Sequence, residues 1–165
     1  MSRSFGWFYL PVAVLCWLAS APPSCAADPE AVAAIQKLGG VPVRAGSDPA
    51  APVVKVEFNR AALTDKTLEE AVRHLKKLRF LRAVTLGFTE VTDAGLVHLN
   101  GLPDLEELGL AQTAVTDAGM IHLRGLKNLK RLDLDRTQVT DKGADDLMAA
   151  LPGLEITRAP APRKE

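Results

Sequence analysis

The chain has 165 residues, of which 47% are hydrophobic and 24% are charged, and this composition suits one soluble domain built around one core. Lysine and arginine together number 20, as do aspartate and glutamate, so the formal net charge is zero. The chain therefore lacks the excess of positive charge that binding to nucleic acid or to an anionic membrane uses, and we expect neither partner.

Residues 1–27 differ in composition from the rest of the chain. Arg3 precedes an apolar run over residues 7–18, and small residues follow that run. This order is typical of a secretory signal peptide, with cleavage expected after Ala26 or Ala27. The run is also too short for a comfortable membrane span. We therefore expect export to the periplasm, the cell surface or the medium, with no membrane insertion after cleavage.

Both cysteines of the chain, Cys16 and Cys25, lie inside this first segment. An uncleaved anchor and a lipoprotein modified at Cys25 are the alternatives to cleavage. The lipoprotein alternative is weakened by Pro22-Pro23-Ser24, which lacks the aliphatic residue expected before a lipidated cysteine. After cleavage the chain would contain neither a disulfide nor a cysteine nucleophile, and its stability would depend on the packed core.

Residues 28–52 are predicted to form an N-terminal cap. Asp28-Pro29-Glu30 supplies an N-cap residue, a first-turn proline and an acid that suits the helix dipole, so a helix is expected from there to Gly39-Gly40. Val41-Pro42-Val43 then predicts a short edge strand, because proline cannot donate to a neighbouring strand. The apolar face of the predicted helix would cover one end of the core, and it contains Val32, Ile35 and Leu38.

One pattern is repeated three times over residues 81–152 at a spacing of 24 residues, with one extra residue in the third copy. Its first half alternates as a short strand does, as in Leu81-x-x-Val84-x-Leu86, and its second half has the spacing of a short helix. A divergent copy with a longer helix precedes it at residues 53–80, and residues 151–156 resemble a final half copy that ends in a strand. A fixed period of this length predicts a solenoid.

Three polar or small positions recur in the repeats. Threonines are expected at the helix N-caps, and acids in the positive first turn that follows. Glycines recur inside the helices at a cost in helix propensity, which predicts that neighbouring repeats approach each other closely there. These positions are Thr92, Thr116 and Thr140, then Asp93, Asp117 and Asp141, and then Gly95, Gly119 and Gly143.

The motif Thr-x-Val-Thr-Asp-x-Gly-Leu that begins at Thr89 resembles the consensus of the leucine-rich repeat family, and it is similar to that of exported bacterial, planctomycete-type members. The resemblance covers roughly residues 28–157. It implies a short α/β solenoid with parallel strands on the concave side, helices on the convex side, and a role in binding another protein. Where many relatives have asparagine, this chain has Thr89, Thr113 and Thr137, whose hydroxyls can still donate to a backbone carbonyl.

The resulting division of the chain has four parts. Residues 1–27 are the signal peptide, 28–52 the N-terminal cap, 53–157 the leucine-rich repeats and 158–165 a disordered tail. The tail is expected because it contains no apolar residue other than alanine and proline, and such a segment cannot bury enough surface to order itself.

The three histidines, His74, His98 and His122, recur 24 residues apart and raise the possibility of a metal site. Neighbouring helices lie about 8 to 10 Å apart, whereas zinc needs its nitrogen ligands at about 2.0 to 2.1 Å. We therefore expect solvated or sideways histidines and no metal. The chain also lacks a Gly-x-Ser-x-Gly elbow and a phosphate-binding glycine loop, so we predict no cofactor and no enzymatic activity.

The strand positions that face away from the helices are the candidate binding surface. They include Ala83, Thr85 and Gly87, followed by charged positions in the next two repeats, and Arg60, Phe88, Gln112 and Arg136 form one column at the rim. Aromatic residues and arginine are the usual hot spots of protein interfaces. The candidate binding residues are Phe88, Glu107, Arg131, Asp133, Asp135 and Arg136.

Two alternatives to a protein-binding surface stay open. A solvated sheet face that binds nothing would carry the same charges. The repeats could also stack end to end or pair through an incompletely covered sheet edge, which would make the protein a structural homo-oligomer.

Overall fold

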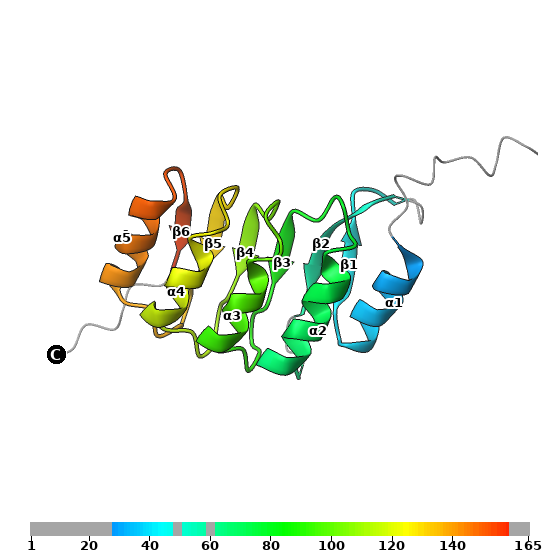
Figure 1. Cartoon of the computed structure of the whole chain (residues 1–165), viewed down its shortest axis with the longest axis horizontal. Coiled ribbons are helices and arrows are strands. Elements are labelled where there is room, and N and C mark those ends of the chain that lie inside the picture. Colours follow the sequence, from blue (N-terminus) through cyan, green and yellow to red (C-terminus); the bar gives the residue numbers. More distant parts are fainter. Residues whose placement is uncertain (1–27, 48–50, 59–61, 159–165) are drawn as a thin grey trace, which may run out of the picture.

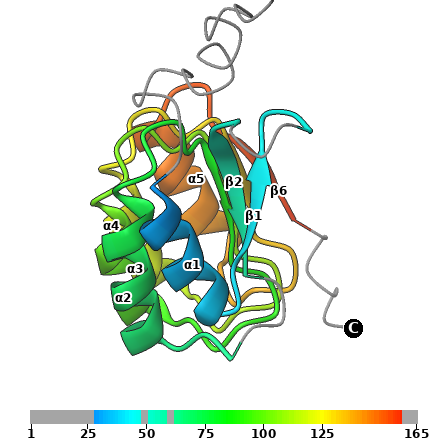
Figure 2. The same ribbon diagram turned by 90° about the vertical axis from the view of Figure 1, so that its right-hand side faces the viewer.

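A computed structural model of the chain describes residues 28–47, 51–58 and 62–158. Within these ranges six strands form one sheet in the order β1-β2-β3-β4-β5-β6. The helices lie together on one face of that sheet (Figure 1; Figure 2). The predicted signal peptide, Arg60 and residues 159–165 of the predicted tail lie outside the described residues.

Helices and strands alternate along the repeats, after an N-terminal helix and an additional strand. The elements are α1 (Pro29–Lys37), β1 (Val41–Arg44), β2 (Val53–Glu57), α2 (Asp65–Leu75), β3 (Ala83–Thr85), α3 (Asp93–Leu99), β4 (Glu107–Gly109), α4 (Asp117–Leu123), β5 (Arg131–Asp133), α5 (Asp141–Ala150) and β6 (Glu155–Thr157).

Strands β2 to β6 are parallel, and equivalent residues of successive repeats lie side by side. Ala83 in β3 pairs with Glu107 in β4, which in turn pairs with Arg131 in β5. The 24-residue period therefore places each repeat position in one column across the sheet. This arrangement confirms the predicted α/β solenoid, with a parallel sheet on one side and helices on the other.

The N-terminal helix and edge strand lie where the sequence predicted them. Asp28 caps α1 by accepting a hydrogen bond from the Glu30 amide at 3.2 Å, and the helix buries Val32 and Ile35 against the core. Strand β1 pairs antiparallel with β2 at the edge of the sheet, with Pro42 opposite Val56. Together α1 and β1 cover the first end of the solenoid.

Each copy of the repeat contributes its leucines to one continuous core between the sheet and the helices. Alternation along the strands turns Val84, Leu108 and Leu132 inward, and the helices turn Leu75, Leu99 and Leu123 toward them. Burial of apolar surface of this extent is the main force that holds short repeats together, since none of them could bury its apolar side alone.

The N-cap threonines begin the helices as predicted. Thr92 and Thr116 accept a hydrogen bond from the backbone amide two residues further on, at 3.3 Å and 3.2 Å, and Thr140 accepts one from Gly143 at 3.3 Å. The divergent first repeat also has the expected longer helix, because α2 has 11 residues and α3 has 7.

The first-turn acids lie where the sequence predicted them, and three of them also connect neighbouring repeats through their carboxylates. Asp93 accepts hydrogen bonds from the Thr116 amide at 2.8 Å and from the Thr116 hydroxyl at 2.6 Å. The same pair of bonds joins Asp65 to Thr92 and Asp117 to Thr140. Parallel stacking brings the N-cap of one helix beside the first turn of the preceding helix, which makes this contact possible. We call these bonds the aspartate ladder.

The recurring glycines confirm the predicted close approach of the repeats. A Cβ atom on Gly95 would lie only 2.5 Å from the Asp65 carboxylate, and a Cβ on Gly119 would overlap the Asp93 carboxylate in the same way. Glycine is therefore needed at these positions because each aspartate of the ladder passes directly over the next helix.

The threonines that replace asparagine close the turn after each strand. Thr89 donates its hydroxyl hydrogen to the Leu86 carbonyl at 2.7 Å, and Thr113 and Thr137 make the equivalent bond to Leu110 and Leu134. The predicted hydrogen bond from hydroxyl to carbonyl is thus confirmed in all three repeats.

Candidate functional site

The helices leave one face of the sheet uncovered, which we call the open sheet face; it is the predicted concave side (Figure 2). Its side chains come from the strand positions that alternate with the buried leucines. Thr85 and Gly109 are half-buried there, and so is Asp133. Ala83, which was expected on this face, is buried at 7% exposure, because it lies in register between the longer side chains of Lys55 and Glu107.

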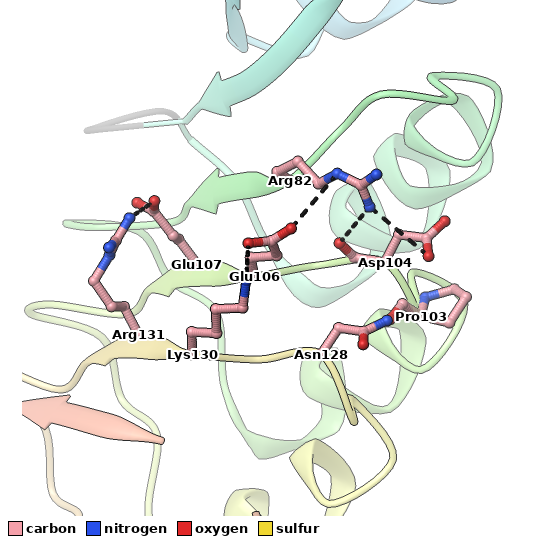
Figure 3. Close-up of polar contacts among 8 residues, drawn as sticks. All are labelled: Arg82, Pro103, Asp104, Glu106, Glu107, Asn128, Lys130 and Arg131. Atoms are coloured by element: carbon pink, nitrogen blue, oxygen red, sulfur yellow. Dashed lines mark hydrogen bonds and ion pairs between the residues drawn. The ribbon is translucent and has the colours of Figure 1, made fainter. Parts of the chain in front are cut away.

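Two predicted binding residues, Glu107 and Arg131, form an ion pair across the open sheet face. They are direct neighbours in the register of β4 and β5, and the Arg131 guanidinium donates to Glu107 Oε1 (Figure 3). Both side chains are exposed, at 62% for Arg131 and 42% for Glu107. Water screens such a pair, so it contributes little to stability but fixes where the two charges stand.

The other predicted charges lie together at the end of β5. The Asp135 amide donates to the Asp133 carboxylate at 3.0 Å, and Arg136 Nε lies 3.8 Å from Asp135 Oδ2. Arg136 is the most exposed of these, with 70% of its side chain accessible. The sequence predicted Asp133 and Asp135 on the concave strand face and Arg136 in the rim column, but their local contacts are visible only in the structure.

The rim column of Phe88, Gln112 and Arg136 has an unusual backbone. All three residues adopt a left-handed conformation, with φ of 60°, 54° and 54°. At two of these positions the backbone bonds to the next repeat: the Phe88 amide donates to the Ala111 carbonyl at 2.9 Å, and the Gln112 amide donates to the Asp135 carbonyl at 2.8 Å. Phe88 is 45% exposed, as the sequence led us to expect.

A second charged cluster at the other end of the strands was missed by sequence reasoning. Arg82 Nε lies 3.7 Å from Glu106, and Lys130 Nζ lies 2.7 Å from the same carboxylate, so the charges alternate across three repeats (Figure 3). The hydrogen bond from Lys130 lowers the pKa of Glu106, and the nearby positive charges of Lys130 and Arg82 act in the same direction. Charges of alternating sign at a spacing of 24 residues were the signal that could have revealed it.

The structure also reveals a shallow groove beside the rim column. It crosses three repeats between the strand ends and the helix N-termini, and it does not include the predicted charges of β4 and β5. Its lining residues are Thr89, Glu90, Thr92, Gln112, Thr113, Ala114, Arg136 and Gln138.

The three histidines are half-buried between the helices and do not form a ligand set. Among residues 28–47, 51–58 and 62–158, no group of three or more histidine, cysteine, aspartate or glutamate side chains is placed to hold a metal ion. In the same ranges no helix is both long enough and apolar enough to cross a membrane.

Comparison with known proteins supports the repeat architecture. The model of a family described as Leucine Rich repeat matches residues 125–148, which correspond to one repeat. A search of curated proteins finds no match. The match at residues 125–148 and the parallel solenoid support the interpretation of the chain as a leucine-rich repeat protein.

Several solved structures are similar to the chain. The Mex67:Mtr2 subunits of Chaetomium align with a TM-score of 0.53 at 17% identity, over 62% of this chain and 77% of that one. Internalin C2 from Listeria monocytogenes aligns at 0.47 and 17% identity, over 68% and 55% of the two chains. A Leptospira interrogans leucine-rich repeat protein aligns at 0.40 and 23% identity, over 52% of this chain and 21% of that one. At these identities the likeness concerns the fold alone.

The fold is therefore an α/β solenoid of the leucine-rich repeat type. This fold is commonly a protein-interaction module, and its members are typically non-catalytic.

Proposed function

We propose that this chain is an exported, non-catalytic module that binds another protein through the open sheet face and its rim. The observation that carries the proposal is the asymmetry of the two faces. The helices cover one face of the sheet, whereas none of the described elements lies over the other face (Figure 2). The side chains of that open sheet face are half-exposed or exposed at Thr85, Glu107 and Arg131.

The charges of the open sheet face support a protein partner of mixed charge. Glu107 pairs with Arg131, and Asp135 lies beside Arg136, so each of these arginines has a negative neighbour. A polyanion would meet an acid beside each of these two arginines. A partner protein with both positive and negative residues on its surface could form ion pairs with these four side chains. Such ion pairs orient the complex more than they attract the partner from a distance.

The aromatic and arginine residues of the rim are the proposed hot spots. Phe88 and Arg136 combine apolar area with a planar donor group, and both are well exposed. Export rests on the apolar segment at residues 7–18, and similarity to planctomycete-type members rests on the repeat consensus.

Capture of the native partner from cells that express the protein tests the proposal. The double variant Phe88→Ala/Arg136→Ala should weaken capture by at least about 2 kcal/mol, the lower bound for a hot spot, and its circular dichroism should be unchanged. The matched control is Lys77→Ala/Arg124→Ala, at exposed residues just after α2 and α4, which should bind as the unaltered protein does. Loss of capture in the control with none in the rim variant would place the interface on the helices.

Self-association is the second candidate, and two exposed valines in the edge strand β1 favour it. Val41 and Val43 expose 59% and 38% of their surface at the edge of the sheet. Pro42 stands between them and cannot donate a hydrogen bond to another strand, which opposes pairing at this edge. A molecular mass that stays monomeric by light scattering across a dilution series would exclude this candidate.

A further inference from the structure

The two edges of the solenoid carry opposite charges, although the chain as a whole is neutral. At one edge the helices end and the strands begin, and at the other the strands end and the helices begin. The first, which we call the basic edge, comprises residues 76–82, 100–106 and 124–130, and the second comprises residues 87–93, 111–117 and 135–141. The basic edge contains seven lysines or arginines and two acids, whereas the opposite edge contains five acids and one arginine. The zero net charge of the chain therefore hides a surface with an excess of five positive charges.

Hydrogen bonds between side chain and backbone hold the loops of the basic edge side by side (Figure 3). Arg82 donates to the Asp104 carbonyl at 3.3 Å, and Asn128 donates to the Pro103 carbonyl at 3.0 Å. Each bond joins one repeat to the next. Equivalent positions of the three loops therefore stand in columns, as they do in the sheet.

Two cations of the basic edge, Arg79 and Lys127, form no ion pair in the part of the chain that the structure describes. They occupy equivalent repeat positions on either side of Pro103, and all three residues are exposed. Each cation lies four residues after its helix ends, beyond the last turn in which a helix dipole attracts positive charge. Neither an ion pair nor a helix end therefore accounts for these two charges.

An exposed aromatic ring adjoins this column. Phe80 follows Arg79 directly and has 39% of its surface exposed. Its equivalent in the next repeat is Asp104, whose side chain is 66% exposed and would repel a continuous row of phosphates. Phe80 is also the only aromatic residue of the basic edge, whereas surfaces that bind single-stranded nucleic acid stack several bases on aromatic rings. A protein segment fits better, because its acids can be separated by apolar residues.

We propose that Arg79, Phe80 and Lys127 form a second interaction surface, which binds an acidic segment of another protein. In this complex one acid pairs with Arg79 and another with Lys127, and an apolar side chain between them packs against Phe80 and Pro103. Arginine and aromatic residues are the usual hot spots of protein interfaces. The surface belongs to the loops that precede the strands, whereas the rim column follows them. The inference therefore goes beyond the proposed function and does not depend on it.

Fluorescently labelled, end-blocked peptides test the inference by anisotropy at low ionic strength. The probe has glutamates on both sides of two leucines, and its control has glutamine in place of every glutamate. Arg79→Gln/Lys127→Gln should weaken binding of the probe at least about threefold, because two exposed ion pairs are lost. The matched variant Lys66→Gln/Lys142→Gln removes the same charge from exposed residues in the first turns of α2 and α5. It should bind the probe as the unaltered protein does.

The aromatic contact has its own test. Phe80→Ala should weaken binding of the leucine probe and leave unchanged the binding of a probe with serine in place of leucine, which also shows that the variant is folded. Equal losses in the two charge variants, or a probe that binds no more tightly than its glutamine control, would overturn the inference. Tighter binding to phosphatidylglycerol vesicles or to a single-stranded DNA oligonucleotide than to the probe would also overturn it, because the edge would then serve another class of partner.

Discussion

Asp93→Ala is expected to break the connection between two repeats without touching the apolar core. The Asp93 carboxylate accepts bonds of 2.8 Å and 2.6 Å from the amide and the hydroxyl of Thr116. A hydrogen bond to a charged group contributes about 1.5 to 3 kcal/mol, and an acid in the first turn of a helix adds about 0.3 to 1 kcal/mol. Asp93 is only half-buried, so water recovers part of the loss. We expect the free energy of unfolding to fall by about 2 to 4 kcal/mol in urea titrations.

Asp141→Ala is the matched control, because Asp141 occupies the same repeat position as Asp93 but its carboxylate pairs with Arg158 instead of an N-cap threonine. Asp141 is 78% exposed and pairs with Arg158, so its removal should cost less than about 1 kcal/mol. Gly119→Ala should damage the same ladder step from the other side, since its Cβ would overlap the Asp93 carboxylate. Combining it with Asp93→Ala should therefore cost less than the sum of the single changes. Equal losses for Asp93→Ala and Asp141→Ala would refute the ladder as a source of stability.

The remaining predictions concern pH and export. The pKa of Glu106 is lowered by its bond to Lys130, so the stability it contributes is present above the pKa of the unfolded chain and is lost as the pH falls through the lower folded value. Lys130→Met should raise the pKa of Glu106 in an NMR titration, and an unchanged titration would show that the bond does not form. Mass spectrometry of the native protein should find an N-terminus at Ala27 or Asp28; an intact Met1 would exclude cleavage.

The repeat elements could be predicted from the sequence because their cause is local and recurs. Alternating leucines define each strand, and threonine followed by an acid marks each helix start, so α3, α4 and α5 begin one residue after Thr92, Thr116 and Thr140. The strand pattern of the first repeat matches that of the later repeats without an insertion. Its four additional residues therefore lengthen the helix α2. The close approach at Gly95 was also predictable, since a helix interior has no other reason to repeat a glycine.

The contacts between repeats could not be predicted in the same way. Periodicity shows which positions form a column, but it does not show how far a side chain reaches along that column. From the sequence, Asp93 is therefore interpreted as an acid at the positive end of its own helix. Only the stacking of α3 on α4 in the structure reveals its hydrogen bonds to Thr116. The burial of Ala83 has the same origin, because it depends on the length of its neighbours Lys55 and Glu107.

The residues that stabilise the fold differ from those proposed to recognise the partner, and this difference decides how substitutions at the rim should be interpreted. Leucines and the aspartate ladder hold the repeats together from the core and from the helix N-termini. The backbone at Phe88 is fixed by its amide bond to Ala111, and the Thr89 hydroxyl closes the same turn onto Leu86. Neither bond involves the Phe88 side chain. A stable variant at Phe88 or Arg136 that loses its partner therefore reports on recognition itself.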